Sequence, residues 1–302
     1  MTLDSYDLGI VADDLTGACD VAACFAPQLG SVGVAVSLDS ELAAGHAQVI
    51  NTQSRLQDYQ SARDLLRRVG SALNSKRVIF KKIDAGLRGP LGAELAGLLE
   101  GLNRAGKKWS CVVAPAIPSI GRTTREGIQY DHGVPINQGA LSRDPHSPPA
   151  SADIRHVIQQ TGGGDFLVAD AENSRDLERI VDAHLKEECV VFAGSLGLAR
   201  ALAGRLRGQF SDDVPGPPAQ QPLLACGSRQ PCSSRQVEHA QRGDIRILGF
   251  DPALRRFNEA IEDDWKDPLL VHRSLNDLYY SSAAGGVCAS ADVRLGTAWL
   301  LQ

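Results

Sequence analysis

Residues 8–18 read Leu8-Gly9-Ile10-Val11-Ala12-Asp13-Asp14-Leu15-Thr16-Gly17-Ala18. The apolar run at their start predicts a buried strand, and the stretch from Ala18 to Pro27 predicts the helix after it. The same order recurs along the chain. Further strands are predicted at 32–36, 49–51, 78–80, 110–114, 166–169 and 190–193. Helices are predicted at 58–73, 91–102, 153–160, 176–186 and 196–206. This alternation is typical of βαβ units, so we expect an α/β fold with a mostly parallel sheet.

A Pro- and Gly-rich linker, Val214 to Ala219, divides the chain into predicted domains 1–213 and 214–302. The second domain has predicted strands at 222–226, 245–248 and 269–271, and predicted helices at 236–241 and 252–262. A parallel sheet must be covered on both faces, which so few elements can hardly achieve. We therefore expect an incomplete second α/β domain, or one that borrows surface from a partner. The apolar end, Leu295 to Gln302, reads as an interrupted helix.

Composition excludes several classes of function. The chain has 302 residues, with 31 Lys and Arg against 36 Asp and Glu, a net charge of −5. Domains that neutralise nucleic-acid phosphates are usually basic, so we expect no nucleic-acid partner. No apolar run is long enough to span a bilayer, and no secretory signal is recognisable, so we expect no membrane partner. The seven cysteines form no C-x-x-C pair, which favours free thiols in the cytoplasm. The histidines show no metal-ligand spacing, so no metal site is predicted on the protein.

Two adjacent carboxylates, Asp13 and Asp14, follow the first predicted strand. In open α/β sheets, ligands bind outside the carboxyl ends of the strands. Carboxylates at that place can hold a cation or accept a proton from a hydroxyl group. The alternative is that one of them caps the next helix. A cap needs only one such side chain, so the pair favours a functional role.

A second polar stretch, Lys81 to Gly89, also follows a predicted buried strand. Its Lys82, Asp84 and Arg88 suit an anionic, hydroxylated ligand, because Arg can bind a carboxylate through two bonds. The alternative is a solvated turn with a surface ion pair.

Three further stretches carry weaker signals. Pro115 to Thr124 offers Arg122 as a donor, or is a rigid connection. Ala193 to Ala199 lets a ligand approach the backbone, or packs a helix closely on a strand. Ser228, in Cys226 to Gln236, lies in a candidate phosphate-binding turn that lacks the G-x-x-x-x-G-K-[ST] pattern.

Taken in order, these motifs resemble the four-carbon acid sugar kinase family, which includes the 3-oxo-tetronate, D-threonate and D-erythronate kinases. The resemblance covers nearly all of residues 8–240. The matching stretches are Ala12 to Ala18, Thr52 with Ser54-Arg55, Lys81 to Asp84 with Leu87-Arg88-Gly89, Pro115 to Arg122, Asp144-Pro145, Asp170-Ala171 to Asp176-Leu177, Gly194 to Ala199, and Gly227-Ser228.

The resemblance implies a sugar-acid-binding domain, a nucleotide-binding domain, and ATP in the cleft between them. The γ-phosphoryl group would pass to a hydroxyl of a four-carbon sugar acid, expected at C4, with Mg²⁺ assisting. The implied roles are binding of the acid by Asp13, Lys82, Arg88 and Arg122, acceptance of the hydroxyl proton by Asp14 or Asp84, and contact with ATP by Ser228. The protein would act in carbohydrate metabolism, and a homodimer is one open arrangement.

The sequence departs from the family pattern at three places. The usual Asp-Ser-Thr becomes Asp84-Ala85-Gly86, and the usual Gly-Ser-x-Ser-Pro becomes Gly227 to Pro231. A late Gly-Gly-Asp-Thr type turn does not occur before Gln302, so the chain is expected to be shortened at its C-terminus. Two interpretations therefore stay open: an ATP-dependent sugar-acid kinase, and a relative that binds a sugar acid but not ATP. A dehydrogenase is disfavoured, because the Gly-rich dinucleotide fingerprint is absent.

Overall fold

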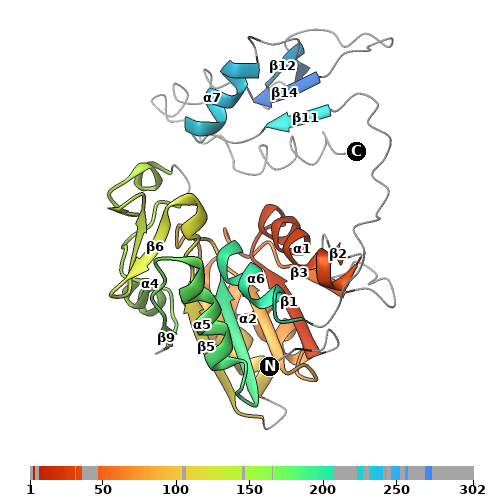
Figure 1. Cartoon of the computed structure of the whole chain (residues 1–302), viewed down its shortest axis with the longest axis vertical. Helices are drawn as coiled ribbons and strands as arrows, with labels where there is room; N and C mark the ends of the chain where they lie inside the picture. Colours follow the sequence, from red (N-terminus) through yellow and green to blue (C-terminus); the bar gives the residue numbers. More distant parts are fainter. Residues whose placement is uncertain are drawn as a thin grey trace. The chain divides into compact units, whose positions relative to one another are not determined.

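Seven parallel strands form the central sheet, as seen in a computed structural model of the chain (Figure 1). In spatial order the strands are β2 (Val32–Ala35), β3 (Ala47–Asn51), β1 (Leu8–Ala12), β4 (Val78–Lys82), β10 (Cys189–Gly194), β5 (Trp109–Ala114) and β9 (Leu167–Val168). The helices between them are α1 (Leu15–Leu29), α2 (Tyr59–Ala72), α3 (Leu91–Asn103), α4 (Ile154–Gln160), α5 (Ser174–His184) and α6 (Leu196–Ala203). This confirms the α/β fold with a mostly parallel sheet.

The structure describes residues 3, 7–30, 32–35, 47–103, 107–144, 147–164, 166–206, 223–226, 231–240, 242, 246–251, 256–257 and 269–273. The chain divides into two compact units, Met1–Asp212 and Asp213–Gln302. None of the described helices is both long enough and apolar enough to cross a bilayer.

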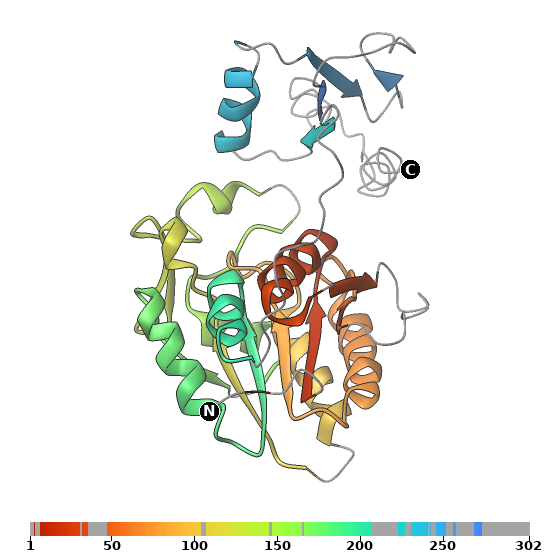
Figure 2. The ribbon, with the colours of Figure 1, turned by 45° about the vertical axis from the view of Figure 1, so that its right-hand side comes forward.

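Helices cover both faces of the seven-strand sheet (Figure 2). Side chains of a strand alternate between the faces, so neighbouring residues enter different cores. Phe80 packs in the core beneath α1, α5 and α6, where its ring meets the ring of Phe25 edge-on at 5.8 Å. Ile79 packs in the opposite core with Leu66 of α2 and Leu98 of α3. Strands buried on both faces explain the continuous apolar runs of the sequence.

Helices α2 and α3 approach each other closely through glycines. A Cβ atom on Gly97 would lie 2.1 Å from the carbonyl oxygen of Arg63, and one on Gly70 would lie 2.3 Å from that of Leu98. Only a residue without a side chain fits at these contacts.

The strand order changes direction at β1. Its neighbours are β3 on one side and β4 on the other, with Ala12 in register with both Asn51 and Lys82. Connections leave β1 and β4 toward opposite sides of the sheet, which is where open α/β sheets bind ligands. The fold therefore brings the ends of β1, β3 and β4 together at one point.

Residues 115–149 include a small antiparallel sheet. Its strands are β6 (Arg122–Arg125), β7 (Ile128–Asp131) and β8 (Val134–Pro135), flanked by the 3₁₀ turns η2 (Pro118–Ile120) and η3 (Ala140–Arg143). Gln129 Nε2 donates to the carbonyl oxygen of Ala85 at 3.1 Å. This hydrogen bond attaches the small sheet to the loop after β4.

The second unit has a four-strand sheet in the order β11 (Leu223–Cys226), β14 (Leu269–Arg273), β12 (Arg246–Asp251) and β13 (Arg256–Phe257), with α7 (Pro231–Ala240). The predicted helix at 252–262 is wrong at Arg256–Phe257. These two residues pair antiparallel with β12, so their peptide groups find partners in the sheet instead of in a helix. The rest of that predicted helix, Gly227-Ser228 and the end at 295–302 lie outside the described residues.

Candidate functional site

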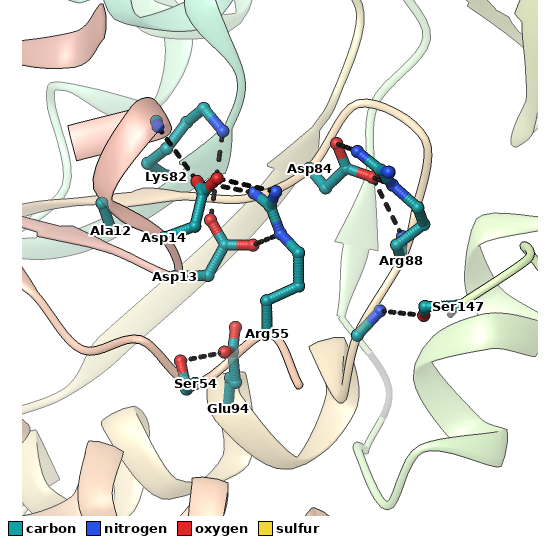
Figure 3. Close-up of polar contacts among 12 residues, drawn as sticks. Ala12, Asp13, Asp14, Ser54, Arg55, Lys82, Asp84, Arg88, Glu94 and Ser147 are labelled. Atoms are coloured by element: carbon teal, nitrogen blue, oxygen red, sulfur yellow. Dashed lines mark hydrogen bonds and ion pairs between the residues drawn. The ribbon is translucent and has the colours of Figure 1, made fainter. Parts of the chain in front are cut away.

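Charged side chains from three strand ends meet at the point where the strand order changes (Figure 3). We call this group the strand-end cluster; its members are Asp13, Asp14, Arg55, Lys82, Asp84 and Arg88. The first two follow β1, Arg55 follows β3, and the last three end or follow β4. Five of the predicted site residues therefore lie together, namely Asp13, Asp14, Lys82, Asp84 and Arg88.

Asp14 both caps a helix and takes part in the cluster. Its Oδ1 accepts a hydrogen bond from Gly17 N at 3.0 Å, which makes it the N-cap of α1. The guanidinium of Arg55 also donates to both of its oxygens, at 2.7 and 2.8 Å. The capping alternative is thus correct for Asp14, and it coexists with a charged contact that a cap does not need.

Asp13 is held on one side only. It is 2 % exposed, and its Oδ2 accepts from Arg55 Nε at 2.7 Å. Its Oδ1 accepts no hydrogen bond within the described part of the chain. Burial alone would raise the pKa of Asp13, but the charges of Arg55, Lys81 and Lys82 outweigh it and hold the pKa below its usual value. Asp13 is therefore ionised, with one oxygen available.

Lys82 faces that available oxygen. Its Nζ lies 4.0 Å from Asp13 Oδ1, and its side chain is 6 % exposed. A Cβ on Gly17 would lie 2.8 Å from Lys82 Nζ, so glycine at the first turn of α1 makes room for the ammonium group. The motif Asp-Asp-Leu-Thr-Gly thus has a steric reason for its glycine.

Arg88 joins two carboxylates at the far side of the cluster. It donates from Nε to Asp84 Oδ2 at 2.6 Å and from one terminal nitrogen to Asp144 Oδ2 at 2.7 Å. Burial opposes ionisation of Asp84, yet Arg88, Arg55 and Lys82 outweigh it and hold its pKa well below the usual 3.8. Leu87, just before Arg88, has a left-handed backbone with φ of 56°, which is rare for a branched residue and occurs often at functional turns.

A second polar group lies beneath Asp13, on the opposite face of β4. Lys81 is fully buried, and its Nζ lies 2.8 Å from Glu94 Oε2 on α3. Ser54 Oγ makes a short contact with Glu94 Oε1 and lies 2.7 Å from Thr52 Oγ1. Thr52 Oγ1 in turn donates to the carbonyl oxygen of Ala12 at 2.8 Å. This chain of contacts ties the end of β1 to α3.

The remaining predicted residues lie elsewhere. Arg122, at the start of β6, has Asp131 Oδ1 as its ion-pair partner, 3.6 Å from its Nε. No ion pair or hydrogen bond joins Arg122 to the strand-end cluster among the described residues, so its role in acid binding stays a prediction. Ser228 lies outside the described residues.

The sequence prediction did not assign Arg55 to the site, although it makes three hydrogen bonds to the two carboxylates after β1. Lys81, Glu94 and Asp144 were also not assigned. A signal for Arg55 was present, because it follows a predicted strand at 49–51 that ends in polar residues.

The strand-end cluster suits a small ligand with a carboxylate and several hydroxyl groups. Arg55 and Arg88 each use three of their five N–H donors within the protein, which leaves donors for an anion. The carboxylates can accept from hydroxyl groups. Among the described residues no three His, Cys, Asp or Glu side chains gather as ligands for a metal ion.

Comparisons with known proteins show the family of the chain. Residues 8–166 match the model of a family described as "Sugar-binding N-terminal domain". A D-threonate kinase of Salmonella typhimurium is 27% identical over 84% of this chain and 66% of its own length. A D-threonate kinase of Bordetella bronchiseptica is 31% identical over 65% of this chain and 54% of its own length. The chain spans less than two thirds of the length of both relatives.

Solved structures share the fold. A Haemophilus influenzae protein has a TM-score of 0.61 at 18% identity, covering 97% of this chain and 80% of its own. A domain of unknown function from Bordetella bronchiseptica, a domain-swapped dimer with bound citrate, has a TM-score of 0.57 at 23% identity. The match covers 87% of this chain and 72% of that one.

Proposed function

Because this chain belongs to the family with a sugar-binding N-terminal domain, among whose relatives are four-carbon acid sugar kinases, we propose that it acts in the phosphorylation of a four-carbon sugar acid. The substrates that we propose are D-threonate, D-erythronate or 3-oxo-tetronate, with phosphoryl transfer from ATP to a hydroxyl, expected at C4. The reaction class is phosphoryl transfer to an alcohol group.

One observation carries this proposal: the ends of β1, β3 and β4 bring buried carboxylates and cations into a single cluster at the switch point of the sheet. A neutral ligand would not need so many cations, and a simple anion would not need the carboxylates. A hydroxylated carboxylate uses both. The cations would bind its carboxylate, and the aspartates would bind its hydroxyl groups.

Phosphoryl transfer depends mainly on positioning and on charge stabilisation. Arg88 and Lys82 would hold the acid, while Arg55 keeps Asp13 and Asp14 in place through three hydrogen bonds. An aspartate of the cluster would accept the proton of the reacting hydroxyl, and Asp14 and Asp84 are the candidates from the sequence. Arg122 would join the acid site from β6.

ATP and Mg²⁺ are part of this proposal. The nucleotide would bind to the second unit, where Ser228 is the candidate contact. Mg²⁺ usually keeps several waters and uses one or two carboxylates together with substrate phosphates, so the absence of a three-ligand group among the described residues is compatible with it. When bound with the nucleotide, the ion would neutralise phosphate charge.

We also propose a cytoplasmic location. Four described cysteines, Cys19, Cys24, Cys111 and Cys189, are free thiols, as in proteins of reducing compartments. A homodimer stays a proposal that sedimentation of the purified protein tests.

The function is tested by measuring ADP release and ligand-induced melting shifts together. The purified protein is given Mg-ATP with each of the three acids, and each ligand is also added alone in a melting experiment. ADP release that depends on one acid supports the kinase. A melting shift by an acid, with neither ADP release nor binding of Mg-ATP, supports the relative that only binds the acid. No response to any of the acids overturns the proposal.

A further inference from the structure

Asp13 Oδ1 is the one carboxylate oxygen, among the buried groups of the described residues, that accepts no hydrogen bond. A buried acceptor without a partner is costly, so native sites rarely retain one without a ligand or a water. The guanidinium of Arg55 fixes the other oxygen, Oδ2, at 2.7 Å. The free oxygen is thereby held in a fixed direction.

The group across from it also lacks a hydrogen bond. Lys82 Nζ, 4.0 Å away, donates to no acceptor among the described residues, although its side chain is almost fully buried. A distance of 4.0 Å is too long for a direct hydrogen bond. It is short enough for one oxygen atom to lie at about 2.8 Å from both atoms. Such an oxygen must donate to Asp13 and accept from Lys82, and a hydroxyl group does both.

We propose that the gap between Asp13 Oδ1 and Lys82 Nζ binds the substrate hydroxyl that receives the phosphoryl group. This inference rests on the proposed function. In the reaction, the O–H bond breaks and its proton moves to Asp13 Oδ1, while the hydroxyl oxygen forms a bond to the γ-phosphorus of ATP. The bond from that phosphorus to the bridging oxygen breaks, ADP leaves with the electron pair, and Asp13 later releases the proton to solvent.

The other two aspartates are less suited to this role. Arg55 donates to both oxygens of Asp14, and Gly17 N donates to one of them as well. Arg88 donates to both oxygens of Asp84. These carboxylates are engaged by cations in the protein, whereas Asp13 keeps one oxygen free and remains ionised because of Arg55, Lys81 and Lys82. Lys82 would stabilise the hydroxyl oxygen as it loses its proton.

The first test measures binding without ATP. The acid that the wild-type protein binds best is compared with its 4-deoxy and 3-deoxy analogues by calorimetry, in the wild type and in Asp13→Asn. We expect loss of the C4 hydroxyl to weaken wild-type binding about 10-fold and binding to Asp13→Asn by less than about 3-fold, since one hydrogen bond to a charged group accounts for such a factor. Loss of the C3 hydroxyl should affect both proteins equally. An equal effect of the 4-deoxy change in both proteins overturns the proposal.

The second test measures turnover. Asp13→Asn should lower kcat about 100-fold or more, because general-base residues contribute such factors, with Mg-ATP binding unchanged. The control is Asp182→Asn, whose carboxylate also accepts two bonds from an arginine, Arg205, but lies on the surface. Should Asp13→Asn fold poorly, Lys82→Gln tests the same gap from its other side. A kcat within about 3-fold of wild type in the folded variant overturns the proposal.

A third measurement tests this inference even if no acid binds and the protein is not a kinase. In a high-resolution crystal structure of the ligand-free protein, an ordered water oxygen should lie within hydrogen-bond distance of both Asp13 Oδ1 and Lys82 Nζ. A direct contact between these two atoms, or a gap without an ordered oxygen, overturns the inference.

Discussion

Arg55 and Asp14 are joined by two parallel hydrogen bonds of 2.7 and 2.8 Å, although 41 positions separate them in the chain. The same guanidinium donates from Nε to Asp13. One side chain therefore holds the loop after β3 against the start of α1. Burial opposes the charge of Arg55, but Asp13, Asp84 and Asp14 outweigh it and raise its pKa, so the cation persists at any pH at which the protein is folded.

Replacing Arg55 should therefore affect both folding and binding. Arg55→Ala leaves the buried Asp13 charge without its main partner and should lower the free energy of unfolding by about 3–5 kcal/mol. Arg55→Lys keeps the positive charge but not the planar guanidinium that donates to both oxygens of Asp14. It should therefore be more stable than Arg55→Ala but less stable than the wild type. Urea unfolding measures both variants. Arg205→Lys, which weakens a similar pair on the surface, is the control and should change little. An Arg55→Lys protein as stable as wild type contradicts this account.

Arg88→Ala should weaken sugar-acid binding by about 1.5–3 kcal/mol, the usual value of a hydrogen bond to a charged group. Calorimetry with the acid alone measures this loss. Arg179→Ala is the matched control, because Arg179 pairs with Asp176 on an exposed helix. An unchanged affinity in Arg88→Ala removes this residue from the acid site.

Asp84 should make stability depend on pH. Its pKa in the folded protein lies below the usual 3.8, despite burial, because Arg88 bonds to it and Arg55 and Lys82 lie near. Its stabilising contribution is therefore present above about pH 4 and is lost as the pH falls through that region toward the folded pKa. The difference in unfolding free energy between wild type and Asp84→Asn should shrink as the pH is lowered from 6 to about 3. A difference that stays constant over this range contradicts the prediction.

Glu94 lies in a buried chain of polar contacts with Ser54, Thr52 and Lys81. Thr52 and Ser54 have one hydroxyl proton each, and that of Thr52 goes to the carbonyl oxygen of Ala12. Ser54 Oγ donates to Glu94 Oε1, and Lys81 Nζ lies 2.8 Å from Glu94 Oε2 as its ion-pair partner. Burial, the largest effect, raises the pKa of Glu94, with Lys81 opposing and Asp13 adding to the rise.

Glu94→Gln should be less destabilised than Glu94→Ala, because the amide keeps the size of the side chain and an oxygen that can accept a hydrogen bond from Ser54 or Lys81. Glu94→Ala should lose about 1–3 kcal/mol for each buried group that it leaves unpaired. Thermal melting at neutral pH compares the two. Because the folded pKa is raised, the contribution of Glu94 is full below pH 4.5 and declines as the pH rises through the folded pKa. A Glu94→Gln protein as unstable as Glu94→Ala contradicts this account of the contacts.

The sequence predicted most of this site because its residues stand at strand ends. Asp13, Lys82 and Asp84 come directly at or after apolar runs, and parallel strands place such ends on one edge of the sheet. Arg55 lies four positions beyond its strand, and its importance depends on β3 lying beside β1, which periodicity does not reveal. Asp144 reaches Arg88 from 56 positions away, through the small antiparallel sheet and its turns. That contact depends on tertiary packing, which leaves no local pattern in the sequence.

The short strand β13 shows the same limit in the second unit. The stretch around Arg256–Phe257 has a helical pattern, but pairing with β12 decides its conformation. Neighbours in the sheet override local preference when a segment is short.

The register that aligns Ala12 with Asn51 and Lys82 decides which face of the sheet each lysine of β4 occupies. If β4 slipped by a single residue, Lys81 and Lys82 would each move to the opposite face of the sheet. The strand-end cluster would then lose the ammonium group of Lys82, and Glu94 would lose that of Lys81. The affinity for the proposed sugar acid should therefore depend on the alignment of the strands in the middle of the sheet. A bound acid would connect the ends of β1, β3 and β4. It would therefore protect these central strands from local opening more than the outer strands.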